Sequence, residues 1–326
     1  MDCVPLAFCE HLLELLRTEV ISKARRLTGS YGELAQHAFE NWARYACLVE
    51  NGSQVGDYME FATGRLVETP EEIAAVPKKF VRIVCIFLSD TEIENVSREV
   101  IRRFPYAVDY SFVLESSSIS EAWVDFAYSL KRLRCVRIMK KLDDDALRLF
   151  QKLVTSRKLF RLVMHPDACE GRTMEIPKFL LCQEQFTEVK ILHRGPDGLW
   201  KTAPIRELLE FWTENREKLR GKCLTVEGNC RSAIDQLGEF LAPKEQGAGI
   251  QISLKVCSKE ECDFINKEYQ YNNSLFAKPS NIYKFEEGRE SDKRLLYIVY
   301  SRLNMSGLHD DLSLMRDTTF FRILLV

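Results

Sequence analysis

A stretch near the middle of the chain alternates between strand-like and helix-like patterning. Residues 133–139 are short, apolar and typical of a strand, residues 143–155 carry apolar side chains at helical spacing, and residues 159–164 are extended again. The unit recurs, because the centres of five successive predicted strands lie 26 or 27 residues apart, at Ile83, Tyr110, Val136, Leu162 and Val189. One strand and one helix per period of this length predict a stacked β/α array rather than a closed enzyme domain.

Most predicted strands of the array are followed by a helical pattern. The strands are expected at residues 80–88, 107–114, 133–139, 159–164, 188–192, 224–227 and 250–256. Asp90, Ser118 and Asp143 lead the segments that open the first three helices, since side-chain oxygens and negative charge favour the positive end of a helix dipole. Further helices are predicted at residues 202–220, 231–241 and 258–269.

The two ends of the chain differ from the array. Residues 1–50 are predicted to form three helices, the third running from residue 33 to about residue 48. Residues 51–78 read as a connector in which residues 58–67 are compatible with a hairpin. The array, residues 79–326, is predicted to close with a hairpin of residues 281–286 and 294–301, and with a final strand or edge cover at residues 320–326.

Composition limits the class of protein but indicates no particular reaction. The chain has 326 residues, 46% of them hydrophobic, and a formal charge of −2 from 46 basic and 48 acidic residues that are mixed along it. The hydrophobic content predicts a folded protein, and the charge balance predicts no electrostatic field that favours nucleic acid or an anionic membrane. The eleven cysteines are scattered and the first residues lack a secretory signal, so we expect reduced thiols and a cytoplasmic or nuclear location.

Sequence motifs for catalysis are absent or weak. No phosphate-binding loop or nucleophile elbow occurs, and no cofactor is expected. Cys223, Cys230, Cys257 and Cys262 lack the tight spacing of a zinc site and are predicted to be core thiols.

Two short segments leave alternatives open. Residues 165–169 bring a histidine, an aspartate and a cysteine together, which is ordinary turn chemistry unless the Cys169 thiol lies within hydrogen-bonding reach of the His165 imidazole. Trp200, in a turn-rich loop, is either a lid over a core edge or an exposed binding anchor.

The first helices carry a family resemblance. Residues 4–16, with Val4 and Pro5 ahead of Phe8 on an amphipathic helix, and residues 38–42, ending in Trp42, resemble a degenerate F-box. They are similar to the opening of F-box-like proteins that are expanded in nematodes, although residues 17–26 are more charged than that family's second helix. The resemblance implies a substrate-recruiting subunit of a cullin-based ubiquitin ligase with no catalytic residue of its own. The residues implied to contact a Skp-type adaptor are Val4, Pro5, Phe8, Leu12 and Leu16.

The predicted fold is therefore α/β: an F-box-like helical unit followed by an irregular, leucine-rich-repeat-like array with parallel strands and helices on one face. Alternate strand residues are then expected on the open face, where mixed charge and hydroxyl groups suit recognition of a protein target. They are Arg82, Asp109, Ser111, Arg137, Arg161, Lys190, Thr225, Gln251 and Ser253.

Two alternatives remain to this assignment. The residues of the open face could be solvated without a partner. The amino-terminal helices could merely cap the array of a freestanding interaction scaffold, in which case Phe8, Leu12 and Leu16 would be buried against Val81 and its neighbours.

Overall fold

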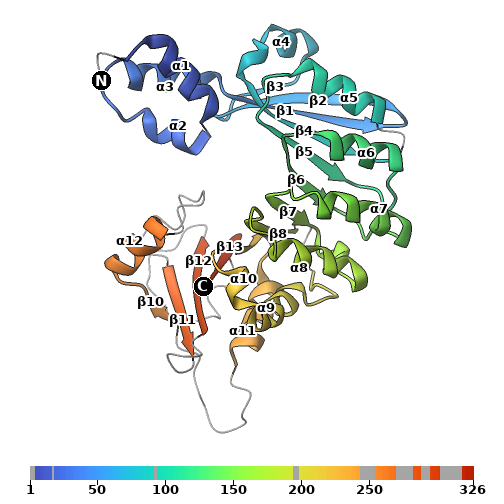
Figure 1. Cartoon of the computed structure of the whole chain (residues 1–326), viewed down its shortest axis with the longest axis vertical. Helices are drawn as coiled ribbons and strands as arrows, with labels where there is room; N and C mark the ends of the chain where they lie inside the picture. Colours follow the sequence, from blue (N-terminus) through green and yellow to red (C-terminus); the bar gives the residue numbers. More distant parts are fainter. Residues whose placement is uncertain are drawn as a thin grey trace. The chain divides into compact units, whose positions relative to one another are not determined.

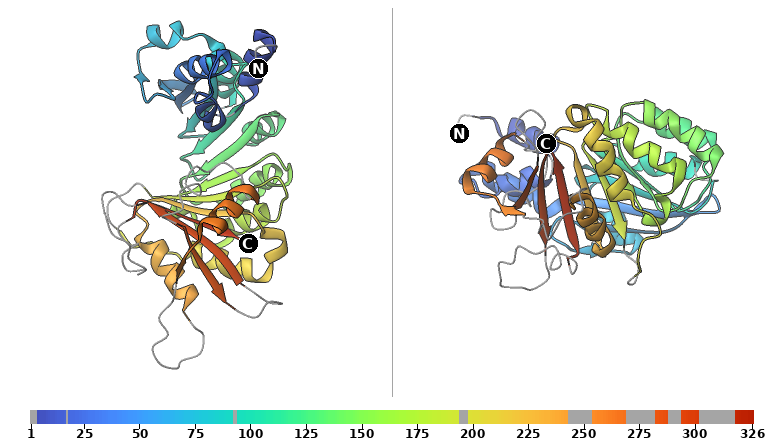
Figure 2. Two further views of the ribbon diagram at one scale, coloured as in Figure 1. Left: turned by 90° about the vertical axis from the view of Figure 1, so that its left-hand side faces the viewer. Right: turned by 90° about the horizontal axis from the view of Figure 1, so that it is seen from below.

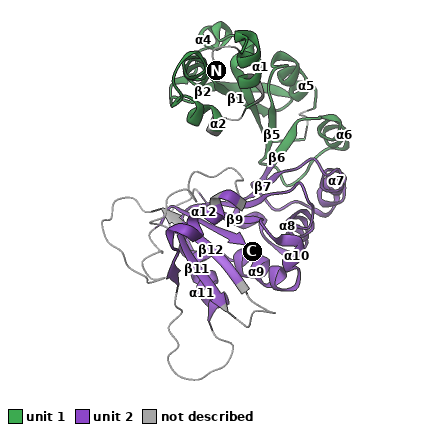
Figure 3. Cartoon of the chain, turned by 60° about the vertical axis from the view of Figure 1, so that its left-hand side comes forward, with its two compact units in different colours: residues 1–135 green, residues 136–326 purple. Residues whose placement is uncertain are grey.

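The computed structural model describes residues 4–16, 18–91, 94–193, 198–242, 254–268, 282–287, 294–301 and 318–326. The chain divides into two compact units, residues 1–135 and residues 136–326 (Figure 3). Hydrogen bonding orders the described strands as β10-β11-β12-β13-β9-β8-β7-β6-β5-β4-β1-β2-β3. The class of fold is α/β, with a sheet whose central strands are parallel.

The sheet of unit 1 is built around β4. β4 (Val81–Leu88) is parallel to β1 (Ala43–Glu50) on one side and to β5 (Asp109–Leu114) on the other. β1 continues antiparallel into β2 (Ser53–Phe61), which pairs with the short β3 (Leu66–Val67), so the hairpin expected in this region is confirmed. The helical elements that follow are α4 (Pro70–Ala75), η1 (Lys78–Phe80), α5 (Glu94–Arg103) and α6 (Glu121–Ser129).

Helix α6 shows how a helix is placed on this sheet. The Ser120 hydroxyl caps it by accepting a hydrogen bond from the Trp123 amide at 3.3 Å. The Trp123 and Phe126 rings then meet the Phe112 ring of β5 edge to face, with centroids 5.3 and 6.4 Å apart. This geometry is the favourable one for aromatic pairs, and it anchors α6 to the face of β5 that carries Phe112 (Figure 1).

Three helices precede the sheet: α1 (Leu6–Leu15), α2 (Thr18–Ala24) and α3 (Ser30–Asn41). They pack around their own small core of Leu13, Ile21, Ala24 and Ala35. The prediction that the third helix runs to residue 48 is wrong, because α3 ends at Asn41 and residues 43–50 form β1.

The turn after β1 explains this difference. Asn51 and Gly52 both have positive φ, 50° and 68°. Positive φ at both central residues is the requirement of the tight turn that matches the twist of a two-stranded hairpin, and Asn-Gly is its preferred sequence. Residues 43–50 are therefore held as a strand by the hairpin and by β4, and they belong to the sheet rather than to the helical unit.

In unit 2 the parallel strands continue through β7 (Arg161–Met164), β8 (Glu188–His193) and β9 (Cys223–Gly228), while β6 (Leu133–Ile138) lies at the division between the units. The intervening helical elements are α7 (Asp144–Thr155), η2 (Pro166–Ala168), η3 (Gly171–Met174), α8 (Glu175–Leu181), α9 (Pro204–Glu214), α10 (Arg216–Leu219) and α11 (Arg231–Leu241). The predicted alternation of strands and helices is confirmed, as is the cap at Asp143, whose carboxylate accepts from the Ala146 amide at 2.7 Å.

The carboxyl-terminal strands end the sheet in a way the sequence did not indicate. β11 (Ile282–Glu287) and β12 (Arg294–Ser301) form the expected antiparallel hairpin, and β10 (Lys255–Val256) pairs with β11. The final strand predicted at residues 320–326 is confirmed as β13 (Phe320–Leu325), but it is an interior strand between β12 and β9, antiparallel to both, and not an edge cover. Of the strand predicted at residues 250–256, residues 250–253 lie outside the described residues.

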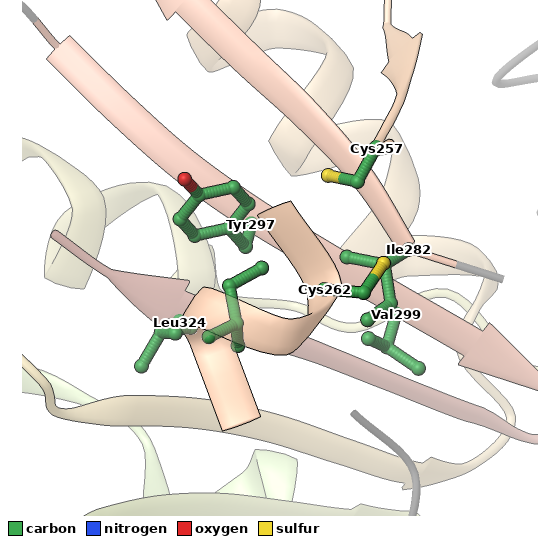
Figure 4. Close-up of a cluster of buried hydrophobic side chains, with 7 residues drawn as sticks. Cys257, Cys262, Ile282, Tyr297, Val299 and Leu324 are labelled. Atoms are coloured by element: carbon green, nitrogen blue, oxygen red, sulfur yellow. The ribbon is translucent and has the colours of Figure 1, made fainter. Parts of the chain in front are cut away.

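Helix α12 (Lys259–Glu268) covers the face of these strands opposite to α9 and α11 (Figures 1 and 2). Its Cys262 and Ile265 pack with Cys257, Ile282, Tyr297, Val299 and Leu324 in one buried cluster (Figure 4). Helices thus lie on both faces at this end of the sheet, whereas the sequence predicted helices on one face only. Among the described helices, none combines the length and the hydropathy needed to cross a bilayer.

Candidate functional site

The first candidate site is the outer side of α1. Val4 and Phe8 expose 42% and 58% of their surface, and Pro5, which precedes the helix at φ −57°, is exposed as well. We call these three residues the α1 surface. Leu12 continues the stripe one turn further and is half-buried, while Leu16 is half-buried and packs against the three-helix core.

The opposite side of α1 holds the helix in place. Leu13 is only 5% exposed and belongs to the core shared with Ile21, Ala24 and Ala35. The α1 surface is therefore presented to solvent on a helix that is already packed. A helix acting only as a cap of the array would bury Phe8, and in this structure Phe8 is more exposed than buried.

The second candidate site is the row of strand residues that the sequence placed on one open face. In unit 1, the register pairs Ile83 with Asp109 and Cys85 with Ser111, so these four share a face. Arg82 lies at an irregularity of the register between β4 and β1, where Ala43 pairs with Val81 and Arg44 with Ile83. Arg82 and Ser111 are 7% and 6% exposed, so the prediction that they face an open surface is wrong.

This face of unit 1 nevertheless carries half-buried apolar and aromatic residues of the kind found on binding surfaces. Ala46 pairs with both Tyr58 and Cys85, and Leu48 pairs with Phe87, which puts them on the face of Ile83 and Asp109. We call Leu48, Tyr58, Ile83, Phe87 and Asp109 the unit 1 sheet face, and each of the five is half-buried. Sequence reasoning missed Leu48 because it extended the preceding helix to residue 48, and it placed Tyr58 in a possible hairpin of the connector without pairing it to a strand before it. The Asn51-Gly52 turn between two alternating segments was the signal that could have found them.

In unit 2, strand residues that were predicted for the open face take part in a buried polar network instead of forming a row of solvated side chains. Thr225 is 1% exposed, and its hydroxyl donates to a carboxylate oxygen of Glu188 at 2.6 Å. Arg322, which β13 brings beside β9, donates to Thr225 at 2.8 Å and to Glu188 at 2.5 Å. The prediction that Thr225 faces an open surface is wrong, because β13 and Glu188 bury it.

Arg161 and Lys190 border this network and retain some exposure. The side chain of Arg161 is 48% exposed and pairs with the second oxygen of Glu188, and Lys190 pairs with Glu227. Arg137 is half-buried, and Asp109 in unit 1 lies 3.9 Å from Arg134. Gln251 and Ser253, also predicted for the open face, lie outside the described residues.

Acidification is expected to weaken unit 2 through Glu188. Burial alone raises the pKa of this carboxyl, but the Arg161 and Arg322 guanidinium groups and the Thr225 hydroxyl outweigh it, so the pKa lies below its ordinary 4.5. A carboxyl with a lowered folded-state pKa stabilises the fold fully above its unfolded pKa, and this contribution is lost as the pH falls through the folded value. In urea unfolding from about pH 6 to about pH 3, wild type should be more stable than Glu188→Gln at the upper end, and the difference should shrink on acidification. A difference that does not change with pH would contradict this role.

Residues 165–169 do not form an activated cysteine. The Cys169 thiol donates to the backbone carbonyl of His165 at 3.3 Å, while the His165 ring accepts from the Asp167 amide and lies 3.4 Å from its carboxylate. Burial raises the pKa of the Cys169 thiol far above its ordinary value, and the side chain is 1% exposed. A protonated, covered thiol is a poor nucleophile, so this arrangement is a buried turn.

The structure gives His165 an aromatic neighbour, His193, which in turn contacts Trp200, and sequence spacing could not supply either contact. The rings of His165 and His193 meet at 5.8 Å between centroids, and the Trp200 indole N–H donates to Nδ1 of His193 at 3.3 Å. Burial, and to a smaller extent His193, lower the pKa of His165, although the Asp167 carboxylate opposes them. Trp200 is half-buried and lies against His193, the last residue of β8.

The four carboxyl-terminal cysteines do not converge. Cys257 and Cys262 share the α12 core, against which Cys223 packs, whereas Cys230 donates to the carbonyls of Val226 and Gly228. Burial raises the pKa of Cys230 and Cys257 to about 12. Within the part of the chain that the structure describes, no three His, Cys, Asp or Glu side chains are grouped as metal ligands would be.

The fold and the surfaces together define an α/β protein with an exposed apolar helix and a half-exposed apolar sheet face. Scans against models of protein families, against curated proteins and against solved structures find no match to the chain.

Proposed function

We propose that this chain is a protein-interaction subunit: its α1 surface binds a Skp-type adaptor of a cullin-based ubiquitin ligase, and its array holds a protein target. The observation that carries the proposal is the exposure of Val4 and Phe8 on a helix whose other side is already packed. In this proposal the array is of the leucine-rich-repeat-like kind, and the chain contributes binding rather than chemistry.

The energetics of the α1 surface favour a partner. Burying one large apolar side chain stabilises a complex by about 1.5–3 kcal/mol relative to leaving it in water. Phe8 and Leu12 are four residues apart and therefore lie on the same side of the helix, next to Val4. The first turn of α1 carries no acidic residue and no side-chain cap, so its apolar residues meet a partner without a charge that must be desolvated.

The unit 1 sheet face supports the second half of the proposal. Leu48, Ile83 and Phe87 supply apolar area, and Tyr58 adds an aromatic side chain of the type enriched at interfaces. Charged groups border this area, since Arg44 pairs with Glu60 at 3.5 Å and both share the row of Ile83 and Asp109. An apolar centre with a polar rim is the usual anatomy of a protein-binding surface.

The test is co-purification of the full chain with recombinant Skp-type adaptors of the source organism. Wild type is expected to form a stable complex, and Phe8→Glu/Leu12→Glu is expected to weaken it at least about 100-fold, because two carboxylates would have to be buried in an apolar contact. Binding is measured by surface plasmon resonance, with circular dichroism as the check that the variant is folded.

The matched control places the same charges on another exposed apolar pair. Phe179 and Leu199 in unit 2 are 48% and 75% exposed, so Phe179→Glu/Leu199→Glu should leave adaptor binding unchanged. Failure of wild type to bind any of these adaptors would overturn the ligase assignment. The freestanding scaffold, in which the sheet face binds protein partners without a ligase, would then be the working description.

A further inference from the structure

A cavity of about 140 Å³ lies between the three amino-terminal helices and the segment that leads into β4. Leu13 and Ile21 belong to its lining, together with Leu34 and Ala38 of one face of α3. Trp42 and Phe80 complete the apolar part. Ala38 is the smallest of these lining side chains.

The polar groups of the cavity are mainly basic. Lys79 and Arg82 line it beside Phe80, and His37 and Glu10 complete the polar lining. The His37 ring meets the Phe80 ring edge to face at 5.8 Å, and the Lys79 ammonium lies 5.1 Å from the centre of the same ring. The Lys79 ammonium beside this aromatic wall therefore offers a cation with which a ligand carboxylate can pair.

The volume limits what can enter. An apolar cavity of about 150 Å³ accommodates one benzene molecule, so the present cavity suits one six-membered ring or a side chain of similar size. Aromatic walls at Trp42 and Phe80 favour a ring over an aliphatic chain, because offset and edge-to-face ring contacts add to the area that is buried.

We propose that this cavity is a binding site for a monocyclic aromatic carboxylate, with the ring against Trp42, Ala38 and Phe80 and the carboxylate at Lys79. Val4 and Phe8 do not line the cavity, so the site is independent of adaptor binding and either can fail without the other.

The experiment is an NMR titration of the ¹⁵N-labelled full chain with phenylacetate, following the indole N–H of Trp42, which is assigned with Trp42→Phe. A ligand of ten heavy atoms is expected to saturate the site with a dissociation constant of about 0.1–1 mM. Phenylacetamide, which has the same shape and no charge, should bind at least about fivefold more weakly.

Lysine variants distinguish specific binding of phenylacetate in the cavity from its nonspecific attraction to positive charge on the surface. Lys79→Gln should weaken phenylacetate about fivefold and leave phenylacetamide unchanged, whereas Lys78→Gln, the neighbouring exposed lysine outside the lining, should change neither. Ala38→Phe should abolish binding of both by filling the cavity. The proposal is overturned if wild type shows no saturable shift up to about 10 mM. It is equally overturned if Lys79→Gln and Lys78→Gln behave alike.

Discussion

Replacing Arg322 with methionine is expected to lower the free energy of unfolding by about 3–5 kcal/mol, which is large against the usual total for a folded domain. Arg322 is 4% exposed and donates to both Glu188 and Thr225. Methionine fills much of the same volume but removes the buried guanidinium from the Glu188 carboxylate, and breaking a buried ion pair by removing one partner is costly. Urea unfolding of the full chain at pH 7, followed by tryptophan fluorescence, measures the loss.

Arg161 provides the matched control for this prediction. It contacts the other oxygen of the same carboxylate, but its side chain is 48% exposed. Arg161→Met should therefore cost no more than about 1 kcal/mol, because solvent screens the pair and replaces the lost donor. Equal losses in the two variants would show that burial by β13 is not what makes the Arg322 contact strong.

The second large effect is expected at Gly32, in the first turn of α3. A Cβ added there would lie 2.8 Å from the carbonyl carbon of Leu27 and closer still to its oxygen. These atoms belong to the backbone that enters α3, so the clash cannot be relieved by turning a side chain. Gly32→Ala should destabilise the three-helix unit by about 2–3 kcal/mol, in spite of the better helix propensity of alanine. Hydrogen exchange of the α1 and α3 amides measures this local loss.

Gly238 in α11 is the control for Gly32. It too is a helical glycine, but a Cβ there would meet nothing within 4 Å. Gly238→Ala should therefore stabilise its helix by up to about 1 kcal/mol, so the two substitutions differ in sign. A stabilised Gly32→Ala variant would mean that the Leu27 carbonyl can move away at little cost. Loss of the α2–α3 packing would also remove the support of α1, so adaptor binding should weaken in Gly32→Ala if the proposed function holds.

The candidate sites were only partly predictable from the sequence. The exposure of Phe8 followed from the broad apolar surface predicted for α1. A short helix packs against its neighbours through one side only, so apolar residues on its other side stay exposed. The open face of the sheet was harder to assign. Assigning residues of β4 to it required the phase of this strand, and a shift of one residue, such as the register irregularity at Arg82, exchanges the two faces. The strand is apolar on both faces, so alternation gave no reliable phase.

The sequence by itself determined the alternation of strands and helices from β4 to β9, the cap at Asp143, and the carboxyl-terminal hairpin. Each of these depends on neighbours within a few residues, and such interactions leave a local pattern. Only the tertiary structure decided that residues 43–50 join the sheet, that β13 lies beside β9, and that α12 covers the face carrying Thr225. Arg322 and Thr225 are 97 residues apart in the chain, and no local pattern records a partner at that distance. Pairing of this kind is selected by the burial and hydrogen bonding of the whole sheet, so it becomes visible only in the folded chain.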